Sequence, residues 1–293
     1  MPRYAYVNGQ FARHSQAHVH IEDRGFQFAD GVYEVVALIN GQWADERGHL
    51  DRLERSLQEL SIAMPVSRPT LQMLMRELAR KNRIHNGNVY IQITRGQARR
   101  DFKFPTHAVR PSLVLTASPF KFDGNANVIK GARAISTPDI RWKRPDIKSI
   151  SLLPQVLAKQ AAAEKGAYEA WLVDDEGYVT EGASSNAWIV KDGKVITRPA
   201  TTNQILRGVT RTALLNLCAQ LQIQLEERPF TIEEAYQADE AFNTGAVALV
   251  VPIIDIDGHK IGSGAPGPVA QRIYQEYRAY AAGQHGEQLG WNA

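Results

Sequence analysis

Residues 32–44 read Val-Tyr-Glu-Val-Val-Ala-Leu-Ile-Asn-Gly-Gln-Trp-Ala, two β-rich runs on either side of Asn40-Gly41. An Asn-Gly pair in this setting is typical of a β-hairpin with a type I′ turn. Asn8-Gly9 has the same setting near the start of the chain, and Asp192-Gly193 predicts a third hairpin. Tight hairpins connect antiparallel strands, whereas parallel strands need a long crossover. The pattern therefore favours an α+β fold over regular alternation of strands and helices.

Leucines recur at helical spacing in two segments after this hairpin. The first set runs from Leu50 to Leu60 and the second from Leu71 to Leu78. Residues spaced by three, four and seven positions share one face of a helix, so both segments are predicted to bury that face. We expect the two helices to cover a sheet formed by residues 4–7, 32–39, 89–94 and 112–117.

A stretch rich in Pro, Gly and Asn at residues 118–127 indicates a linker, so we place a domain boundary near residue 120. Domain 1–120 is the smaller and domain 121–293 the larger, and both are expected to be α+β. In the larger domain we expect strands at 128–136, 169–173, 186–190 and 247–256, and helices at 152–165, 210–221, 232–236 and 268–281.

The composition is that of an ordinary globular protein, with 34 basic and 31 acidic residues, a net charge of +3 and 44% hydrophobic residues. No run of like charges predicts nucleic-acid or membrane-surface binding. The longest aliphatic run, residues 246–254, is too short to span a bilayer. The first ten residues have no pattern of a signal peptide, which favours a cytoplasmic location. The single cysteine, Cys218, lies in an apolar stretch and is expected to be a buried hydrophobic residue.

Two further patterns are interpreted as structural. Residues 262–267 match GxGxxG, but only a terminal helix follows, and Pro266 and Pro268 have no amide to donate. His14, His18 and His20 lie close together without an acidic residue that would complete a metal-ligand spacing. We expect neither a dinucleotide site nor a metal site.

Three segments together point to cofactor chemistry. Lys148 lies between Ile147 and Ile150, where partial desolvation would favour an unprotonated, nucleophilic amine. Glu181 lies in a tight Gly-, Ala- and Ser-rich segment, and residues 208–210 begin an apolar helix whose free amides could bind phosphate. Taken alone, each residue has a structural alternative: Lys148 could be a surface lysine, and Glu181 could be a turn residue. Together, however, they match the needs of pyridoxal phosphate: an amine, an anion for the pyridine nitrogen and an anchor for the phosphate.

Five blocks then carry a resemblance to a known family. Residues 22–35, 49–53, 146–149, 179–182 and 206–211 resemble the class IV aminotransferases, which are fold type IV pyridoxal phosphate enzymes. The branch that is most similar is that of the D-amino acid transaminases, and matching blocks keep their order from residue 4 to about residue 258. The resemblance implies a small N-terminal domain, a larger mixed-sheet domain that binds pyridoxal phosphate, and a homodimer.

The same resemblance implies roles for the cofactor-binding residues. Lys148 would form the Schiff base with pyridoxal phosphate and move the substrate proton, and Glu181 would bind the pyridine nitrogen. The phosphate would be bound by Arg52 and by the helix start at Val209 and Thr210, while Leu206 would pack on the ring. The family usually has a threonine where this chain has Ala246, which would remove one hydrogen bond to the phosphate.

For the substrate carboxylate the resemblance implies Tyr33 and Arg100. Phe102 occupies the position of a family histidine, so one hydrogen-bond donor is lost. Another group such as Arg99 could replace that donor, or carboxylate binding is loosened and less polar amines are tolerated.

The implied reaction is ping-pong transamination between a D-amino acid such as D-alanine or D-glutamate and a 2-oxo acid such as 2-oxoglutarate or pyruvate. Alternatives of the same fold are a branched-chain L-amino acid aminotransferase, an (R)-selective amine transaminase and an aminodeoxychorismate lyase. A non-catalytic binding protein on this scaffold is a further alternative, which the presence of both Lys148 and Glu181 disfavours.

Overall fold

The computed structural model describes residues 3–284, which form two compact units. Among these residues, the N-terminal unit comprises residues 3–121 together with Ile147–Ser151, and the C-terminal unit comprises Phe122–Asp146 and residues 152–284. The predicted boundary near residue 120 places every residue from 121 onward in the larger domain. The short segment Ile147–Ser151 departs from that division because it packs and pairs with the N-terminal unit.

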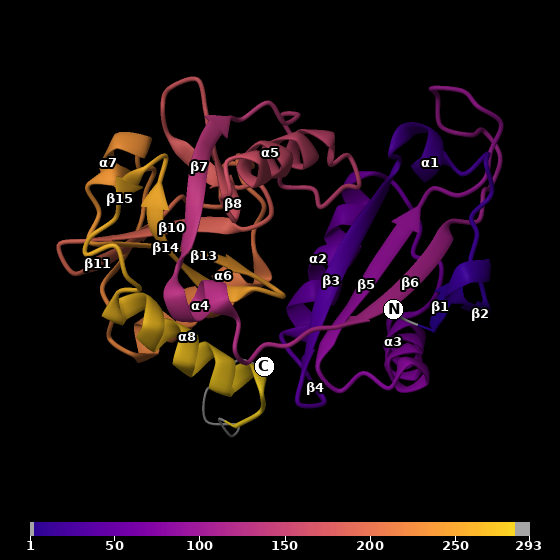
Figure 1. Cartoon of the computed structure of the whole chain (residues 1–293). Coiled ribbons are helices and arrows are strands. Elements are labelled where there is room, and N and C mark those ends of the chain that lie inside the picture. Colours follow the sequence, from indigo (N-terminus) through magenta and orange to yellow (C-terminus); the bar gives the residue numbers. More distant parts are fainter. Residues whose placement is uncertain (1–2, 285–293) are drawn as a thin grey trace. The chain divides into compact units, whose positions relative to one another are not determined.

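The sheet of the N-terminal unit is antiparallel and has the order β2-β1-β6-β5-β3-β4, as the purple strands β3, β5 and β6 in Figure 1 illustrate. Asn8 and Gly9 have φ of 47° and 107°, and Asn40 and Gly41 have φ of 51° and 81°. Two consecutive positive φ values are what a type I′ turn requires, so the hairpin predictions are confirmed. The strands are β1 (Tyr4–Val7), β2 (Gln10–Arg13), β3 (Gly31–Ile39), β4 (Gln42–Trp43), β5 (Gly87–Thr94) and β6 (Ser112–Pro119).

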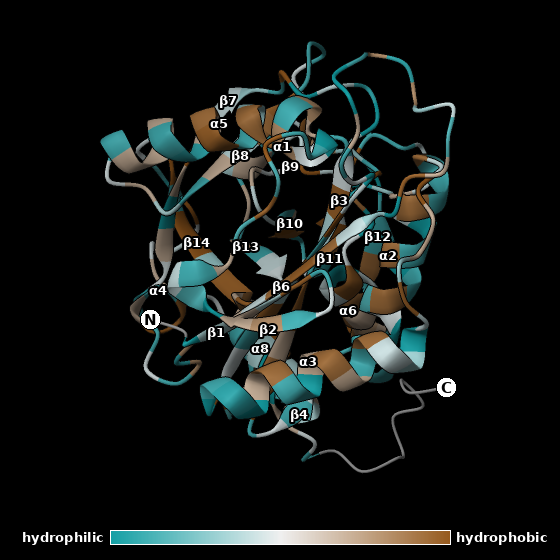
Figure 2. Ribbon diagram, turned by 90° about the vertical axis from the view of Figure 1, so that its right-hand side faces the viewer, coloured by the Kyte–Doolittle hydropathy of each residue, from teal (hydrophilic) through white to brown (hydrophobic). Residues whose placement is uncertain are grey.

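Helices α2 (Glu46–Glu59) and α3 (Arg68–Asn82) bury their leucine faces in one core with this sheet. Alternating hydrophobic and hydrophilic stripes along α3 are visible in Figure 2. Leu50, Leu53 and Leu71 are fully buried there against Val36 and Ile91. The predicted amphipathic helices are therefore confirmed. The short elements η1 (His14–Gln16) and α1 (Arg24–Phe28) were not anticipated.

The segment Ile147–Ser151 joins the N-terminal unit beside the start of β3. The Tyr33 amide donates to the carbonyl oxygen of Lys148 at 2.9 Å, and the Ile150 amide donates to the carbonyl of Gly31 at 3.1 Å. Ile147 is buried in the same core as the leucines of α2. Backbone pairing and apolar burial thus position Lys148 next to β3.

The C-terminal unit contains a nine-stranded mixed sheet, with the path β12-β11-β10-β13-β14-β7-β8-β9 and β15 paired to β14. Its parallel pairs are β11 with β12, β14 with β7, and β7 with β8. The strands are β7 (Ala132–Pro138), β8 (Glu169–Val173), β9 (Val179–Gly182), β10 (Asn186–Lys191), β11 (Lys194–Thr197), β12 (Leu225–Glu227), β13 (Glu240–Gly245), β14 (Leu249–Ile256) and β15 (His259–Lys260).

Most helices of this unit match the predicted ones, as their bounds show: α5 (Leu153–Glu164), α6 (Val209–Gln220), α7 (Ile232–Tyr236) and α8 (Pro268–Ala281). The prediction of a strand at 128–136 is wrong in its first part. A short helix, α4 (Ala126–Lys130), precedes β7 because the Asn125 side chain accepts from the Asn127 amide at 3.0 Å, and Gly131 ends the helix at φ +80°.

The glycine-rich segment 262–267 ends at α8, and its last residue, Gly267, is the N-cap of that helix. The Glu240 carboxylate accepts hydrogen bonds from the amides of Val269 and Ala270 at 3.0 and 2.8 Å. An anion from the chain itself therefore occupies this helix N-terminus, in agreement with the interpretation that it is no phosphate loop. Among the described residues, no helix has the length and apolarity to cross a membrane.

Candidate active site

Lys148 lies over an aromatic ring in the N-terminal unit. Its Nζ is 4.2 Å from the centroid of the Tyr33 ring, and that ring stacks on Tyr90 with 5.6 Å between centroids. Burial and the proximity of Tyr33 raise the pKa of Tyr90 to about 12, so its hydroxyl stays neutral and donates to Gln92 Oε1 at 2.7 Å. Two predicted site residues, Lys148 and Tyr33, are thus brought together.

Arg52 of α2 is held by a carboxylate that the sequence interpretation did not consider. Its Nε and Nη2 donate to the two oxygens of Glu34 at 2.6 and 2.9 Å, and His49 Nδ1 lies 2.8 Å from Glu34 Oε2. Glu34 is fully buried on β3. Burial alone would raise the pKa of Glu34, but the Arg52 charge and the hydrogen bonds from His49 and Arg52 outweigh it and hold that pKa well below its usual range.

Arg100 and Phe102 lie in the exposed loop between β5 and β6. The Arg100 guanidinium lies 5.1 Å from the ring centroid of Phe28 and 5.8 Å from that of Phe102, which is within cation–π range. The two rings are 5.5 Å apart. Within residues 3–284, Arg100 makes no ion pair with a carboxylate. Both predicted substrate residues of this loop therefore lie together.

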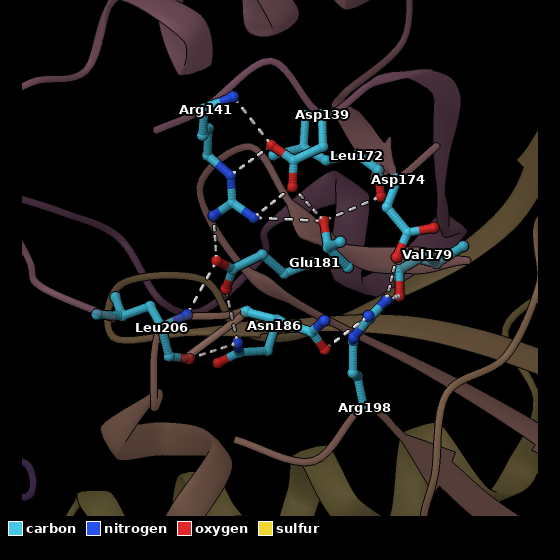
Figure 3. A network of polar contacts seen from close by, with 11 residues as sticks. Asp139, Arg141, Leu172, Asp174, Val179, Glu181, Asn186, Arg198 and Leu206 are labelled. Atoms are coloured by element: carbon cyan, nitrogen blue, oxygen red, sulfur yellow. Dashed lines mark hydrogen bonds and ion pairs between the residues drawn. The ribbon is translucent and has the colours of Figure 1, made fainter. Parts of the chain in front are cut away.

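Glu181 of β9 is the centre of a polar network in the C-terminal unit (Figure 3). Its Oε1 accepts from Arg141 Nη1 and from the Leu206 amide, the latter at 3.0 Å, and its Oε2 accepts from Asn186 Nδ2 at 2.9 Å. Burial raises the pKa of Glu181, and Arg141 and the Leu206 amide offset this only in part. Asp139 adds to the rise because it is a nearby negative charge.

Asn186 connects Glu181 to the start of α6. The same Nδ2 also donates to the Leu206 carbonyl at 3.0 Å, and a Cβ added to Gly208 would lie 2.0 Å from Asn186 Oδ1. Gly208 is the N-cap of α6, and no side chain within the described residues caps this end. The first turn, which begins with Val209 and Thr210, thus has no side-chain acceptor, unlike the N-terminus of α8.

The remaining predicted residues are placed as follows. Thr210 is buried, and its Oγ1 accepts from the Tyr277 hydroxyl at 3.4 Å. Leu206 contacts Glu181 and Asn186 through its backbone. Ala246 lies in the short turn between β13 and β14, which continues to Leu249 at φ +57°. Cys218 is free and buried, and burial raises the pKa of its thiol to about 12, so it is a poor nucleophile.

These groups fit pyridoxal phosphate. The C-terminal unit combines a buried carboxylate, which suits a pyridine nitrogen, with an uncapped helix N-terminus that Asn186 connects to it, which suits a phosphate. Lys148 belongs to the N-terminal unit, where its amine lies over the ring of Tyr33. In the described part of the chain, no cluster of three or more His, Cys, Asp or Glu side chains is arranged to bind a metal.

Sequence reasoning missed the residues that hold these groups: Glu34, His49, Asp139, Arg141 and Asn186. A charged residue between the apolar positions of β3 was a usable signal for Glu34, since such a residue is rarely buried without a partner. The others have no local signal because their contacts join segments that are distant in sequence.

Comparison with known proteins identifies the family. The family model described as amino-transferase class IV matches residues 31–256. A D-alanine aminotransferase of Bacillus licheniformis is 40% identical over 266 residues, which cover 91% of this chain and 93% of that protein.

Solved structures of the same fold agree. The branched-chain amino acid aminotransferase of Escherichia coli superposes with a TM-score of 0.90 at 26% identity, covering 99% of this chain and 98% of that one. The branched-chain amino acid aminotransferase of Thermobaculum terrenum, solved in its PLP-form, superposes with a TM-score of 0.82 at 26% identity, covering 99% of this chain and 97% of that one. The expected two-domain fold is therefore confirmed, and the chain belongs to the class IV aminotransferases.

Proposed function

We propose that the protein is a pyridoxal phosphate-dependent transaminase that exchanges an amino group between a D-amino acid and a 2-oxo acid. D-alanine or D-glutamate would be the donor, and pyruvate or 2-oxoglutarate the acceptor. The observation that carries this proposal is the 40% identity with a D-alanine aminotransferase over 91% of the chain. The buried carboxylate and uncapped helix of the C-terminal unit support it, because they suit the cofactor.

The bound cofactor supplies an aldehyde for the amino group and an aromatic ring that stabilises negative charge at the substrate α-carbon. Lys148 Nζ would hold the cofactor at its aldehyde and would move the proton at the substrate α-carbon. Glu181 would keep the pyridine nitrogen protonated by accepting a charge-assisted hydrogen bond from it. Within the C-terminal unit, the backbone amides of Val209, Thr210 and Ala246 would bind the phosphate, and Leu206 would pack on the ring. The family resemblance also implies Arg52 as a phosphate ligand, and in the N-terminal unit its Nε and Nη2 donate to Glu34.

Arg100 and Tyr33 bind the substrate carboxylate in this proposal. Support comes from the absence of a carboxylate partner for Arg100 within residues 3–284, which leaves its charge available. Phe102 supplies no hydrogen bond and makes this region more apolar, so an (R)-selective amine transaminase is the second candidate function.

The proposal includes a homodimer in the cytoplasm. A single buried cysteine, which cannot form an intramolecular disulfide, is compatible with a reducing compartment. The branched-chain alternative rests on the structural neighbours at 26% identity and is weaker than the comparison at 40%.

A panel of half-reactions tests the substrate class. The yellow enzyme is mixed separately with D-alanine, D-glutamate, L-leucine and (R)-1-phenylethylamine, and the loss of the cofactor's visible absorbance is followed. We expect D-alanine to react fastest. Reaction with L-leucine but not with D-alanine would contradict the proposal, and reaction with the amine alone would favour the second candidate.

Lys148→Ala tests the catalytic role directly. We expect loss of borohydride-reducible cofactor and a fall in transamination by at least about a thousandfold, since the group that moves the proton is gone. The exposed Lys194 provides a matched control, and Lys194→Ala should behave as the parent protein. Equal activity of the Lys148 and Lys194 variants would refute the mechanism.

A further inference from the structure

Arg141 is shared between two carboxylates in the C-terminal unit (Figure 3). Its Nε and Nη2 donate to Asp139 Oδ1 and Oδ2 at 2.9 and 2.7 Å, while its Nη1 donates to Glu181. The Thr180 hydroxyl donates to Asp139 Oδ2 at 2.8 Å. Asp139 therefore binds the Arg141 guanidinium bidentately, and Glu181 accepts from one N–H group of that guanidinium.

The cluster is nearly closed to solvent. The side chains of Arg141, Glu181 and Asp139 are 5%, 6% and 12% exposed. Two carboxylates facing one guanidinium leave one negative charge without a counter-charge among these three groups. An uncompensated buried charge is costly, so the cluster favours a cation as an additional partner. A protonated pyridine nitrogen is such a cation.

Asp139 is the source of this excess negative charge. Without it, Arg141 and Glu181 would form a neutral pair, and Glu181 would attract a second cation much less. We propose that Asp139 is a positioning residue that, by occupying Arg141 bidentately, leaves Glu181 with the charge that keeps the pyridine nitrogen protonated. This inference rests on the proposed function, in which Glu181 binds that nitrogen.

A neighbouring ion pair provides a matched control. Arg198 Nη1 donates to Asp174 Oδ2 at 2.8 Å, and its Nη2 donates to Gln204 Oε1 at 2.8 Å, without a bond to Glu181 (Figure 3). Asp174→Asn removes the same charge in the same unit as Asp139→Asn, but from a pair that Glu181 does not share.

The first test reads the protonation of the nitrogen itself. Holoenzymes carrying pyridoxal phosphate labelled with ¹⁵N in the ring are compared by NMR at one neutral pH. We expect the parent and Asp174→Asn to show the protonated nitrogen, and Asp139→Asn to move clearly toward the unprotonated position. Asp139→Glu, which restores the charge, should recover much of the parent signal. An unchanged signal in Asp139→Asn would overturn the inference.

The second test uses 1-deaza-pyridoxal phosphate, in which carbon replaces the ring nitrogen. With the natural cofactor, Asp139→Asn should slow the D-alanine half-reaction about tenfold, the effect of one pKa unit on the nitrogen. With the deaza analogue the variant and the parent should agree within about twofold, because no nitrogen remains to be protonated. An equal loss with both cofactors would refute a role through Glu181.

Two outcomes separate the inference from the proposed function. A parent protein that binds no pyridoxal phosphate would overturn both, whereas a yellow, active parent with an insensitive Asp139 would overturn only the inference. If Asp139→Asn does not fold, Thr180→Val removes the hydroxyl that supports Asp139 and should shift the ¹⁵N signal less but in the same direction. No shift in that variant would then count against the inference.

Discussion

Glu34 and Glu181 are both buried, and both bind an arginine, yet their pKa values are displaced in opposite directions. Burial acts to raise both, but Arg52 and His49 outweigh it at Glu34 and hold that pKa far below its usual range. At Glu181 burial prevails, and the pKa is raised despite Arg141. The difference lies in how the arginine is used.

Arg52 donates to both oxygens of Glu34, and His49 adds a further contact. Arg141 gives its bidentate face to Asp139 and one N–H group to Glu181. A carboxylate that binds one arginine with both oxygens forms a structural ion pair. A carboxylate that shares its arginine with a second carboxylate is only partly neutralised and favours a further cation. We infer that the first is built to hold α2 on β3 and the second to hold a ligand.

The largest effect is expected from Glu34→Gln. Removing the charge leaves the Arg52 guanidinium, 10% exposed, without its counter-ion, so the free energy of unfolding should fall by about 3–5 kcal/mol. Urea denaturation measures this change. Glu77→Gln on α3 is the control. The Glu77 side chain is 31% exposed and pairs with Arg80 and Lys81, and solvent-screened pairs of this kind contribute little, so its loss should shift the urea midpoint only slightly. A fall no larger than the control's would mean that Glu34 is not ionised in the folded protein.

Glu181→Gln should instead affect chemistry more than stability. Arg141 keeps Asp139 as its partner, so the free energy of unfolding of the apoenzyme should change by about 1 kcal/mol or less. The D-alanine half-reaction should slow about a hundredfold, because in the proposed function Glu181 is the anion that binds the pyridine nitrogen. Stopped-flow absorbance measures the rate. If Glu181→Gln lost several kcal/mol of free energy of unfolding but reacted at the parent rate, Glu181 would be a structural residue and the contrast with Glu34 would be wrong.

The pH dependence of stability should separate the two carboxyls. The lowered pKa of Glu34 contributes stability that is present above about pH 4.5, its ordinary value, and is lost as the pH falls toward the folded-state pKa. The raised pKa of Glu181 contributes stability that is present below about pH 4.5 and is lost as the pH rises through the folded-state pKa.

Urea titrations of the apoenzymes between about pH 3 and pH 7 check this expectation. As the pH falls, the free energy of unfolding of the parent should decrease relative to that of Glu34→Gln. Relative to that of Glu181→Gln it should increase. If the free energies of unfolding of the two variants, each relative to the parent, changed in the same way with pH, the two carboxyls would have pKa values displaced in the same direction.

The smallest effect is expected from His49→Gln. It weakens one contact to Glu34 and leaves both bonds from Arg52, so the free energy of unfolding should fall by about 1–2 kcal/mol. The loss should disappear in the Glu34→Gln background, which a double-mutant cycle measures. An additive loss would show that His49 stabilises the fold through other contacts.

Much of the fold could be predicted from local sequence. Asn40-Gly41 can adopt two positive φ values in succession, and the leucines of residues 50–60 lie on one helical face whatever they pack against. The error at residues 128–136 has the same origin. Val128 and Ile129 are favourable in strands, but Asn125 and Gly131 bound a helix through contacts that hydrophobic pattern alone does not indicate.

The candidate site divides in the same way. Lys148, Glu181 and the Gly208–Thr210 helix start could be named from the sequence because their residue types and neighbours suit the chemistry, and their roles stay a prediction. The residues that hold these groups in place could not be predicted from the sequence. The sequence shows no reason why Arg52 should bind Glu34, or why Asp139 should compete with Glu181 for Arg141.

By itself, then, the sequence determined the elements whose signals lie within a few residues: the hairpins, the amphipathic helices and the three chemical segments. The tertiary structure alone decided that residues 147–151 join the N-terminal unit and which carboxylate receives each arginine. Charge interactions depend on distance and burial in space, and Arg141 and Glu181, 40 residues apart in the sequence, become neighbours only when the segment after β7 folds beside β9.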